Sequence, residues 1–437
     1  MHNIVSKLLI YGNMPEDSIL MELSNIIREY KGENYKKDEI ITRIYHQIKR
    51  ILEISTDYAF DKNLWHNYLT YLLITNENPF SLTCEKVGAS DGSVNYFAKN
   101  DFKQFKKLFD YDFGPMEEEL GIDCFSRIEN YKAIGKPELM YNKNVSEKII
   151  ALSAQLEAAE DVDAFFAAVT GFYKDYGVGM FGLNKAFRIK EKDGGDVEFV
   201  AINNMDKVML DDLIGYEIQK KKLVDNTKAF VEGRAANNVL LFGDSGTGKS
   251  TSIKAIVNEF YPDGLRMIEI YKHQFKDLST IIAQIKNRNY KFIIYMDDLS
   301  FEEFEIEYKF LKAVIEGGVE TKPDNVLIYA TSNRRHLIKE TWKDREDMEH
   351  SEDLHRSDTM EEKLSLVNRF GLSIFYAKPN KEGFNEMAVA LARRAGITPE
   401  TMSDEEICYE ANRFEMRGGG LSGRTAQQFA NYLLTIK

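Results

Sequence analysis

The feature that most constrains this chain is an apolar strand that runs directly into a glycine-rich loop. Residues 237–250 read NNVLLFGDSGTGKS, so the pattern G-x-x-x-x-G-K-S spans residues 243–250, and a helical stretch follows at 251–260. Glycine lets the backbone turn so that successive N–H groups point at a phosphate. A helix that starts near Lys249 adds the positive end of its dipole. The pattern predicts a polyphosphate site in which Lys249 reaches the β- and γ-phosphates and the Ser250 hydroxyl binds Mg²⁺.

The alternative for this loop is a glycine turn that matches the pattern by chance. It is disfavoured because a strand precedes the loop and a helix follows it. We expect contacts to the nucleotide from the loop and the first helical turn. These residues are Gly243, Asp244, Ser245, Gly246, Thr247, Gly248, Lys249, Ser250 and Thr251.

A second motif follows the loop at residues 291–298, which read KFIIYMDD. Its apolar run is typical of a central parallel strand buried on both faces, and open α/β sheets bind ligands at the carboxyl ends of their strands. We expect Asp297 to lie on the Mg²⁺ side and Asp298 to polarise the attacking water. The alternative is a helix start capped by Ser300, but the order after the phosphate loop favours the functional interpretation.

Three polar residues follow in an order that fits the same site. Asn333 ends another buried-type strand (325–331), where its side chain can orient the attacking water. Arg369 follows a helical stretch. Arg424 lies in the first turn of the C-terminal helix, for which Ser422 is a plausible cap. A cation in the first turn of a helix is repelled by the positive end of the helix dipole. An anion bound nearby would offset this repulsion.

These motifs resemble those of the AAA+ ATPases. The phosphate loop corresponds to Walker A and the strand before Asp297 to Walker B, while Asn333, Arg369 and Arg424 match sensor 1, the arginine finger and sensor 2. The segment 213–217, with Ile214 and Gly215, resembles the one that lines the adenine pocket. Over roughly residues 170–437 the chain more specifically resembles the bacterial domain of unknown function 815 family. The phrases that carry this are ANNVLLFG (236–243), MDDLSFEE (296–303), ATSNRRH (330–336), EKLSLVNRFG (362–371) and LSGRTA (421–426).

The chain departs from the AAA+ pattern in two places. Walker B usually ends in Asp-Glu, but here Asp298 replaces the glutamate, and its carboxylate falls short by roughly a bond length. Because a base must reach its proton, we expect slow hydrolysis or a base supplied by Glu302 or Glu303. In addition, the strand at 265–270 is not followed by the aromatic-hydrophobic-glycine loop with which unfoldases thread substrates, which disfavours a processive unfoldase.

The resemblance implies an ATPase that uses ATP and Mg²⁺, with Arg424 sensing the γ-phosphate from a helical lid. It also implies a homo-oligomeric ring, with a hexamer as the expected number, in which Arg369 completes the site of a neighbouring subunit. Internal pairing of Arg369 with an acidic residue from 346–362 is the alternative. The ring would act on an unidentified protein or nucleoprotein partner. The alternative function is a slow-turnover ATP-dependent switch, loader or scaffold that could be DNA-associated.

Alternating strands and helices predict a doubly wound α/β core at 196–378. Residues 1–195 are predicted to form a mostly helical domain of unknown role, and 379–437 a small helical lid. The charged, glycine-bearing segment 190–196 is the best boundary between the first two. The predicted strands are 239–242, 265–270, 292–296, 326–330 and 373–377, and helical spacing is clear at 19–30 and 64–74.

Composition narrows the partners and the compartment. A net charge of −13 implies no general affinity for nucleic acid. The aromatic and lysine residues of 95–113 could bind single strands, but a packed core with solvated charges is favoured. Cys84, Cys124 and Cys408 are odd in number and lack metal-ligand spacing, which fits a reducing cytoplasm. No run of 18 apolar residues occurs, so we expect no membrane span.

Overall fold

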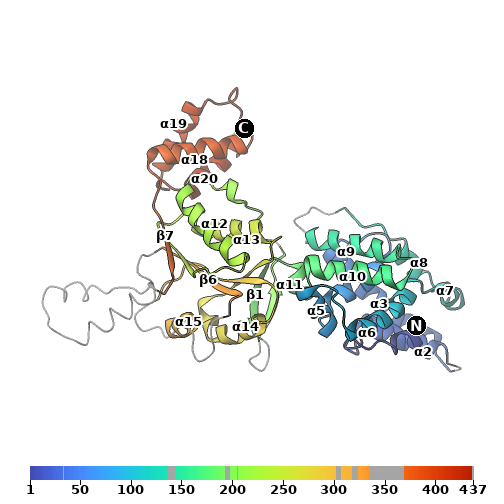
Figure 1. The fold of residues 1–437 in the computed structure, drawn as a ribbon. Coiled ribbons are helices and arrows are strands. Elements are labelled where there is room, and N and C mark those ends of the chain that lie inside the picture. The colour runs from blue at the N-terminus through green and yellow to red at the C-terminus, as the bar shows by residue number, and fades with distance from the viewer. Residues whose placement is uncertain are drawn as a thin grey trace. The chain divides into compact units, whose positions relative to one another are not determined.

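A division after Asn184 separates a helical unit from a unit built around a β-sheet. The computed structural model describes residues 1–32, 34–135, 143–191, 197–203, 205–301, 307–316, 323–333 and 369–435. Figure 1 shows both units, coloured along the chain from blue to red. The division lies earlier than the boundary expected at 195, because β1 (Ala186–Glu191) and β2 (Val197–Ala201) belong to the sheet.

The elements of the first unit are helices. They are α1 (His2–Val5), α2 (Ile19–Tyr30), α3 (Lys37–Tyr58), α4 (Leu64–Thr75), α5 (Pro79–Val87), α6 (Ser93–Phe109), α7 (Gly114–Leu120), α8 (Cys124–Glu129), α9 (Lys143–Glu157), α10 (Val162–Tyr176) and α11 (Gly179–Leu183). The helices expected at 19–30 and 64–74 are confirmed. The Asp161 side chain caps α10 by accepting a 2.8 Å hydrogen bond from the Ala164 N–H.

The aromatic residues of the segment 95–113 divide between the core and the surface. Phe102 and Phe105 are fully buried and Phe113 is almost so, whereas Tyr96 is 76% exposed. The core interpretation of this segment is therefore confirmed for its central phenylalanines, which lie on the inward face of α6.

A buried carboxylate ties the N-terminal segment to α6. Asp101 is fully buried, and its Oδ2 accepts hydrogen bonds from the backbone N–H groups of Leu9 (3.0 Å), Ile10 (2.8 Å) and Tyr11 (2.9 Å). This arrangement satisfies three backbone donors with one side chain, so the carboxylate replaces the secondary-structure bonds that residues 9–11 would otherwise need.

Replacing Asp101 with alanine is expected to loosen this segment. The change removes the acceptor of three backbone N–H groups, of which that of Tyr11 is buried, and a hydrogen bond to a charged group contributes about 1.5–3 kcal/mol. We expect amide hydrogen exchange at residues 9–11 to accelerate by at least about tenfold. Asp110→Ala on the exposed end of the same helix is the control; equal exchange in both variants would contradict the prediction.

The second unit holds a seven-stranded sheet in the order β2-β1-β4-β5-β6-β3-β7. Its further strands are β3 (Val239–Gly243), β4 (Leu265–Glu269), β5 (Lys291–Met296), β6 (Val326–Ser332) and β7 (Leu372–Tyr376). All neighbouring strands are parallel except β1 and β2, which form an antiparallel pair. The five strands predicted from the sequence are confirmed, and the doubly wound fold class is correct.

Helices cover both faces of this sheet. Figure 1 shows α12 (Glu217–Val231) and α13 (Lys249–Phe260) on one side and α14 (Leu278–Ile285) and α15 (Glu307–Glu316) on the other. The first pair packs its apolar side chains, such as Leu223 and Ile256, against sheet residues such as Leu241 and Tyr295. The apolar strands are therefore buried as the sequence indicated.

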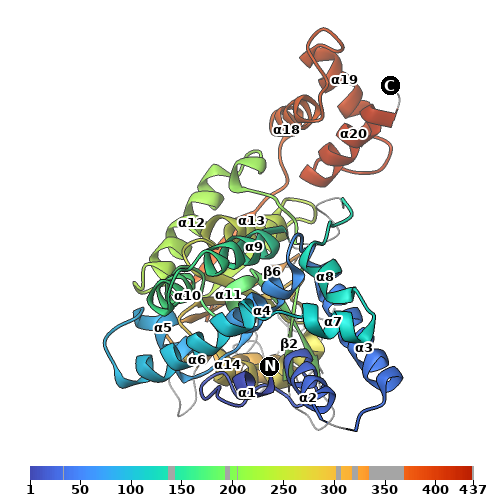
Figure 2. The same cartoon turned by 90° about the vertical axis from the view of Figure 1, so that its right-hand side faces the viewer.

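The chain ends in a helical lid, as predicted. It consists of α18 (Lys381–Arg394), α19 (Asp404–Glu415) and α20 (Gly423–Thr435), which lie together in Figure 2. These helices share a small core that includes Phe384, Ile407 and Phe429. No described helix is both long and apolar enough to cross a lipid bilayer.

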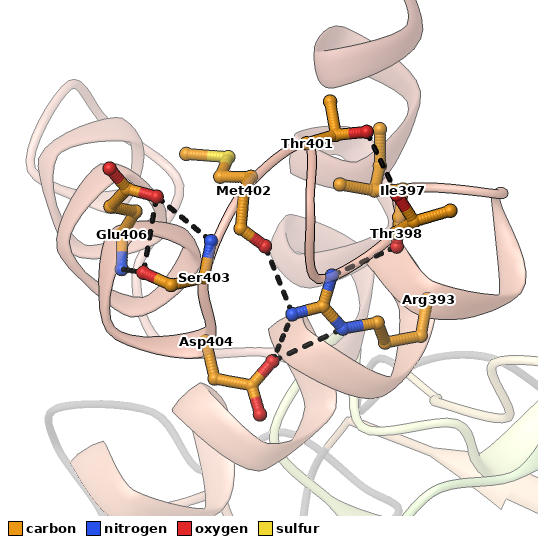
Figure 3. Close-up of polar contacts among 8 residues, drawn as sticks. All are labelled: Arg393, Ile397, Thr398, Thr401, Met402, Ser403, Asp404 and Glu406. Atoms are coloured by element: carbon orange, nitrogen blue, oxygen red, sulfur yellow. Dashed lines mark hydrogen bonds and ion pairs between the residues drawn. The ribbon is translucent and has the colours of Figure 1, made fainter.

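Arg393, in the last turn of α18, bonds to the connection between the first two lid helices (Figure 3). Arg393 donates hydrogen bonds to the backbone oxygens of Ile397 (2.9 Å) and Met402 (3.0 Å), and its Nε lies 3.1 Å from Asp404 Oδ1. Ser403 then starts α19 through a capping box with Glu406. Arg393 of α18 thus satisfies backbone oxygens of the loop, and Ser403 with Glu406 satisfies backbone donors at the start of α19.

Candidate active site

The phosphate loop connects β3 to α13 and turns at its glycines. Gly243, Gly246 and Gly248 have φ angles of 134°, 75° and 90°, a region that favours glycine. A Cβ atom at Gly243 would lie 2.2 Å from the backbone oxygen of Tyr376 in the neighbouring strand. The loop therefore requires glycine both for its turns and for close packing against β7, and α13 begins at Lys249 as predicted.

Lys249 is almost completely buried and lies at the centre of the site. Its Nζ donates hydrogen bonds to the backbone oxygens of Gly243 (3.1 Å) and Asp244 (2.6 Å) and to Asn333 Oδ1 (3.0 Å). Burial lowers the pKa of Lys249, while the carboxylates of Asp244, Asp298 and Asp297 act in the opposite direction. The ammonium group is thus held among acceptors that a polyphosphate could replace.

Asp297 lies at the carboxyl end of β5 and meets Ser250 at the start of α13. The Ser250 hydroxyl donates to Asp297 Oδ1 at 2.7 Å, and the Thr331 hydroxyl donates to the same oxygen at 2.6 Å. Desolvation acts to raise the pKa of Asp297, but these hydrogen bonds outweigh it and the pKa lies below its ordinary value. The carboxylate is therefore charged at neutral pH.

The oxygen pair of Ser250 and Asp297 fits Mg²⁺, which takes oxygen ligands and keeps several waters. The described residues contain no group of three or more His, Cys, Asp or Glu side chains placed to hold a metal by themselves. The remaining ligands of a bound Mg²⁺ would thus come from water and phosphate oxygens, as in other phosphate-loop proteins.

Asp298 and Asn333 lie together beside Lys249. The Asn333 Nδ2 donates to Asp298 Oδ1 at 2.8 Å, and the same asparagine accepts from Lys249 through its Oδ1. Asp298 has a φ of 49°, in the left-handed region that non-glycine residues rarely adopt. Glu302 and Glu303, the alternative bases, lie outside the described residues.

The lid reaches the phosphate loop through the start of α20. The backbone N–H of Arg424 donates to the backbone oxygen of Gly246 at 3.1 Å. Ser422 caps the helix by accepting from the Thr425 N–H at 3.1 Å, as expected. The Arg424 side chain is exposed, and its charge contributes to lowering the pKa of Lys249. An anion beside the loop would therefore lie within the field of both cations.

The segment expected to line the adenine pocket lies between the loop and the lid. A Cβ atom at Gly248 would lie 3.7 Å from Leu213, and one at Gly215 would lie 3.2 Å from Met387 of α18. Ile214 packs against the lid core. The segment thus contacts both parts of the unit that a nucleotide would bridge.

Arg369 lies just before the amino end of β7, whereas the phosphate loop of its own chain follows the carboxyl end of the neighbouring β3. It precedes β7, whose Leu372 pairs with Val239 at the start of β3, whereas Tyr376 pairs with Gly243 at the loop. A strand rises about 3.3 Å per residue, so the whole length of β7 separates Arg369 from the loop. Residues 346–362, its alternative partners, lie outside the described residues.

Sequence reasoning missed two polar contacts of the site. One is the hydrogen bond from Thr331 to Asp297. A polar residue within an apolar buried strand needs a hydrogen-bond partner, and this was the available signal. The Asp244 side chain accepts a 2.9 Å hydrogen bond from the backbone N–H of Lys378, beyond the end of β7. In both cases the partner lies far away in the sequence, and the contact depends on which strands are neighbours.

Gly246 offers a direct test of the contact between the loop and the lid. Its φ is 75°, and a Cβ atom there would lie 3.1 Å from Ser422 Oγ and 3.2 Å from Arg424 Cβ. In a Gly246→Ala variant the loop is expected to leave this conformation, because the left-handed region costs an L-residue roughly 1–2 kcal/mol. Binding weakens when fewer molecules hold the loop in the conformation that binds the nucleotide. We therefore expect the affinity for Mg-ATP to fall by about tenfold or more.

The control for this prediction is Gly233→Ala. Gly233 has a similar φ of 77°, and a Cβ atom at this position would have no described neighbour within 4 Å. Titration of a fluorescent ATP analogue should show normal affinity in this variant. Equal affinity in both variants would mean that the loop does not depend on its contact with the lid.

The strand order and the site together define the class. Strands β4, β5, β6, β3 and β7 lie side by side, the phosphate loop follows β3, the acidic pair follows β5, and a helical lid contacts the loop. This is the arrangement of an AAA+ P-loop ATPase. The chain belongs to the DUF815 family, described as proteins of unknown function, whose model matches residues 183–436.

Solved structures show weaker likenesses. A mutant of RuvB from Thermotoga maritima is 17% identical with a TM-score of 0.36, over 53% of this chain and 67% of that one. PCH-2 from C. elegans is 17% identical with a TM-score of 0.35, over 52% of this chain and 65% of that one. No curated protein matches this chain.

Proposed function

We propose that this protein hydrolyses ATP with Mg²⁺ and couples its nucleotide state to conformational change in a homo-oligomer. The observation that carries the proposal is the continuous network from Lys249 through Asn333 to Asp298, beside the bonded pair of Ser250 and Asp297. These residues come from three separate segments and converge on the loop that suits a polyphosphate.

Each residue of the network has a role in this reaction. Lys249 and the loop N–H groups hold the phosphates, while Ser250 and Asp297 hold the metal, which neutralises phosphate charge when bound. Asp298 accepts the proton of the attacking water, and Asn333 orients that water. Phosphoryl transfer requires mainly positioning and charge stabilisation, which is what a preformed network supplies.

The proposal includes a shared active site between subunits. Arg369 lies at the sheet edge away from its own loop, which supports a role for this residue at a neighbouring subunit. The family resemblance adds a ring, with six subunits as the expected number. A head-to-tail ring repeats one interface around a closed circle, so each loop would face one Arg369.

The lid supplies a route from nucleotide to movement. Arg424 bonds to the phosphate loop through its backbone and would contact the γ-phosphate through its side chain. Loss of that phosphate would then release the lid from the core. We propose that this movement acts on a protein or nucleoprotein partner. The free thiols of Cys84, Cys124 and Cys408 support a cytoplasmic location.

A slow-turnover switch, loader or scaffold is the second candidate. The observation in its favour is Asp298, whose short side chain is bound by Asn333 in the structure. To act as a base, the Asp298 carboxylate must first break this hydrogen bond, and its side chain is shorter than that of glutamate. Both features would support only slow hydrolysis. A DNA-dependent increase in turnover would favour a loader on DNA, and ATP-dependent assembly without turnover would favour a scaffold.

The deciding experiment measures phosphate release per subunit across a range of protein concentrations. Lys249→Ala serves as the inactive control, because it removes the cation that holds the β- and γ-phosphates. Turnover that rises with concentration in the parent and is absent in the control supports the shared-site ATPase. Tight Mg-ATP binding with negligible turnover at every concentration supports the switch or scaffold. Absence of nucleotide binding contradicts both.

A further inference from the structure

One buried threonine contacts three consecutive residues at the end of β5. The Thr331 hydroxyl donates to Asp297 Oδ1 at 2.6 Å and accepts from the Asp298 N–H at 2.9 Å. Its backbone oxygen accepts from the Leu299 N–H at 2.7 Å. Thr331 is only 2% exposed, so the hydrogen bonds of its hydroxyl with Asp297 and Asp298 are shielded from competing water.

The chain needs such a support because the two carboxylates are adjacent in sequence. Successive side chains of a strand point to opposite faces of the sheet. Here Asp297 contacts Ser250 while Asp298 contacts Asn333, and both of those partners belong to the same site around Lys249. The left-handed backbone at Asp298, with a φ of 49°, breaks the alternation and brings both carboxylates to that site.

A left-handed aspartate persists only where its surroundings stabilise it. The Asp298 N–H has two acceptors in the structure, Thr331 Oγ1 at 2.9 Å and Asp297 Oδ1 at 3.2 Å. The second acceptor is itself bound by the Thr331 hydroxyl. Removal of this one hydroxyl would therefore affect both the turn and the carboxylate beside it.

We propose that Thr331 is the positioning residue of this site, and that its hydroxyl sets the metal-side carboxylate and the base in their relative geometry. This inference rests on the proposed ATPase function. The hydroxyl bonds to the Asp297 carboxylate and to the Asp298 N–H, so it acts through these two residues. Loss of groups that orient ligand residues typically costs about 10- to 100-fold in activity or metal affinity.

The test compares Thr331→Val, Thr331→Ser and Ser332→Ala. Valine keeps the shape but loses the hydroxyl, whereas serine keeps it. Ser332 is the matched control, because its buried hydroxyl also joins β6 to this junction but donates to the Leu299 backbone oxygen (2.8 Å). We expect the kcat of Thr331→Val to fall roughly 10- to 100-fold with the KM for Mg-ATP nearly unchanged. Thr331→Ser and Ser332→Ala should stay close to the parent.

Two results would overturn the inference. One is a Thr331→Val protein with the kcat of the parent, and the other is an equal loss in Ser332→Ala, which would indicate general damage to the junction. If the parent shows no turnover, the proposed function fails separately. In that case the measurement is the increase in ADP affinity that Mg²⁺ causes. If only Thr331→Val loses this increase, Thr331 positions the site. If the increase is equal in all variants, the inference is rejected.

Discussion

Replacing Arg369 with alanine is expected to lower ATP turnover by roughly 10³- to 10⁵-fold, the range for an arginine supplied to phosphoryl transfer. Nucleotide affinity should change little, because Arg369 lies at the far edge of the sheet from its own phosphate loop. The measurement is phosphate release at saturating Mg-ATP, with nucleotide affinity determined on the same preparation. An oligomer that assembles normally and turns over like the parent would exclude an interfacial role.

A mixing experiment distinguishes a shared site from a local one. Arg369→Ala subunits keep an intact Asp298, and Asp298→Asn subunits keep an intact Arg369. If the arginine acts on the neighbouring subunit, mixed oligomers contain some interfaces with both groups intact, and turnover should exceed that of either variant alone. If the arginine acts within its own subunit, mixing restores nothing, because each site lacks one of the two groups.

Asp298→Asn is expected to lower turnover by roughly 10²- to 10⁴-fold, the usual contribution of a general base. Asparagine tolerates the left-handed backbone, and its side-chain oxygen can still accept from Asn333. The variant therefore removes the basicity while it preserves the turn. Mg-ATP binding should persist. Full turnover in this variant would move the role of base to another residue, with Glu302 and Glu303 as the first candidates.

The matched variant Asp298→Glu tests whether the short side chain limits the rate. Glutamate restores the missing methylene but is less tolerant of the left-handed conformation. An increase in turnover would show that reach is limiting and that the parent is built for slow hydrolysis. A decrease would show that the backbone turn and the short side chain are matched to each other.

Much of the site could be predicted because its motifs are local. The glycine loop, the acidic pair and the capped start of α20 each consist of residues close in sequence, and their apolar strands carry a strong signal. The structure brings Lys249 and Asn333, two of the residues selected in this way, within hydrogen-bond distance of each other. Their roles in catalysis remain predictions.

The features that the sequence did not reveal depend on distant contacts. The hairpin of β1 and β2 adds two short strands beside β4, but its charged middle resembled a linker between domains. The contact between Thr331 and Asp297 requires the register in which Ala330 pairs with Met296. Such pairings follow from the assembled sheet rather than from any local pattern.

The bond between Asp244 and Lys378 bears on the proposed movement of the lid, because it ties the chain just before the lid to the phosphate loop. Asp244 of the phosphate loop bonds to this part of the chain twice. Its side chain accepts from the Lys378 N–H, and its own N–H donates to the backbone oxygen of Tyr376, the last residue of β7, at 3.0 Å. The Tyr216 hydroxyl secures the intervening Ala377 through its backbone oxygen at 2.8 Å. These bonds hold residues 376–378 to the phosphate loop and to Tyr216, so the proposed movement of the lid would turn about the residues from Pro379 onward.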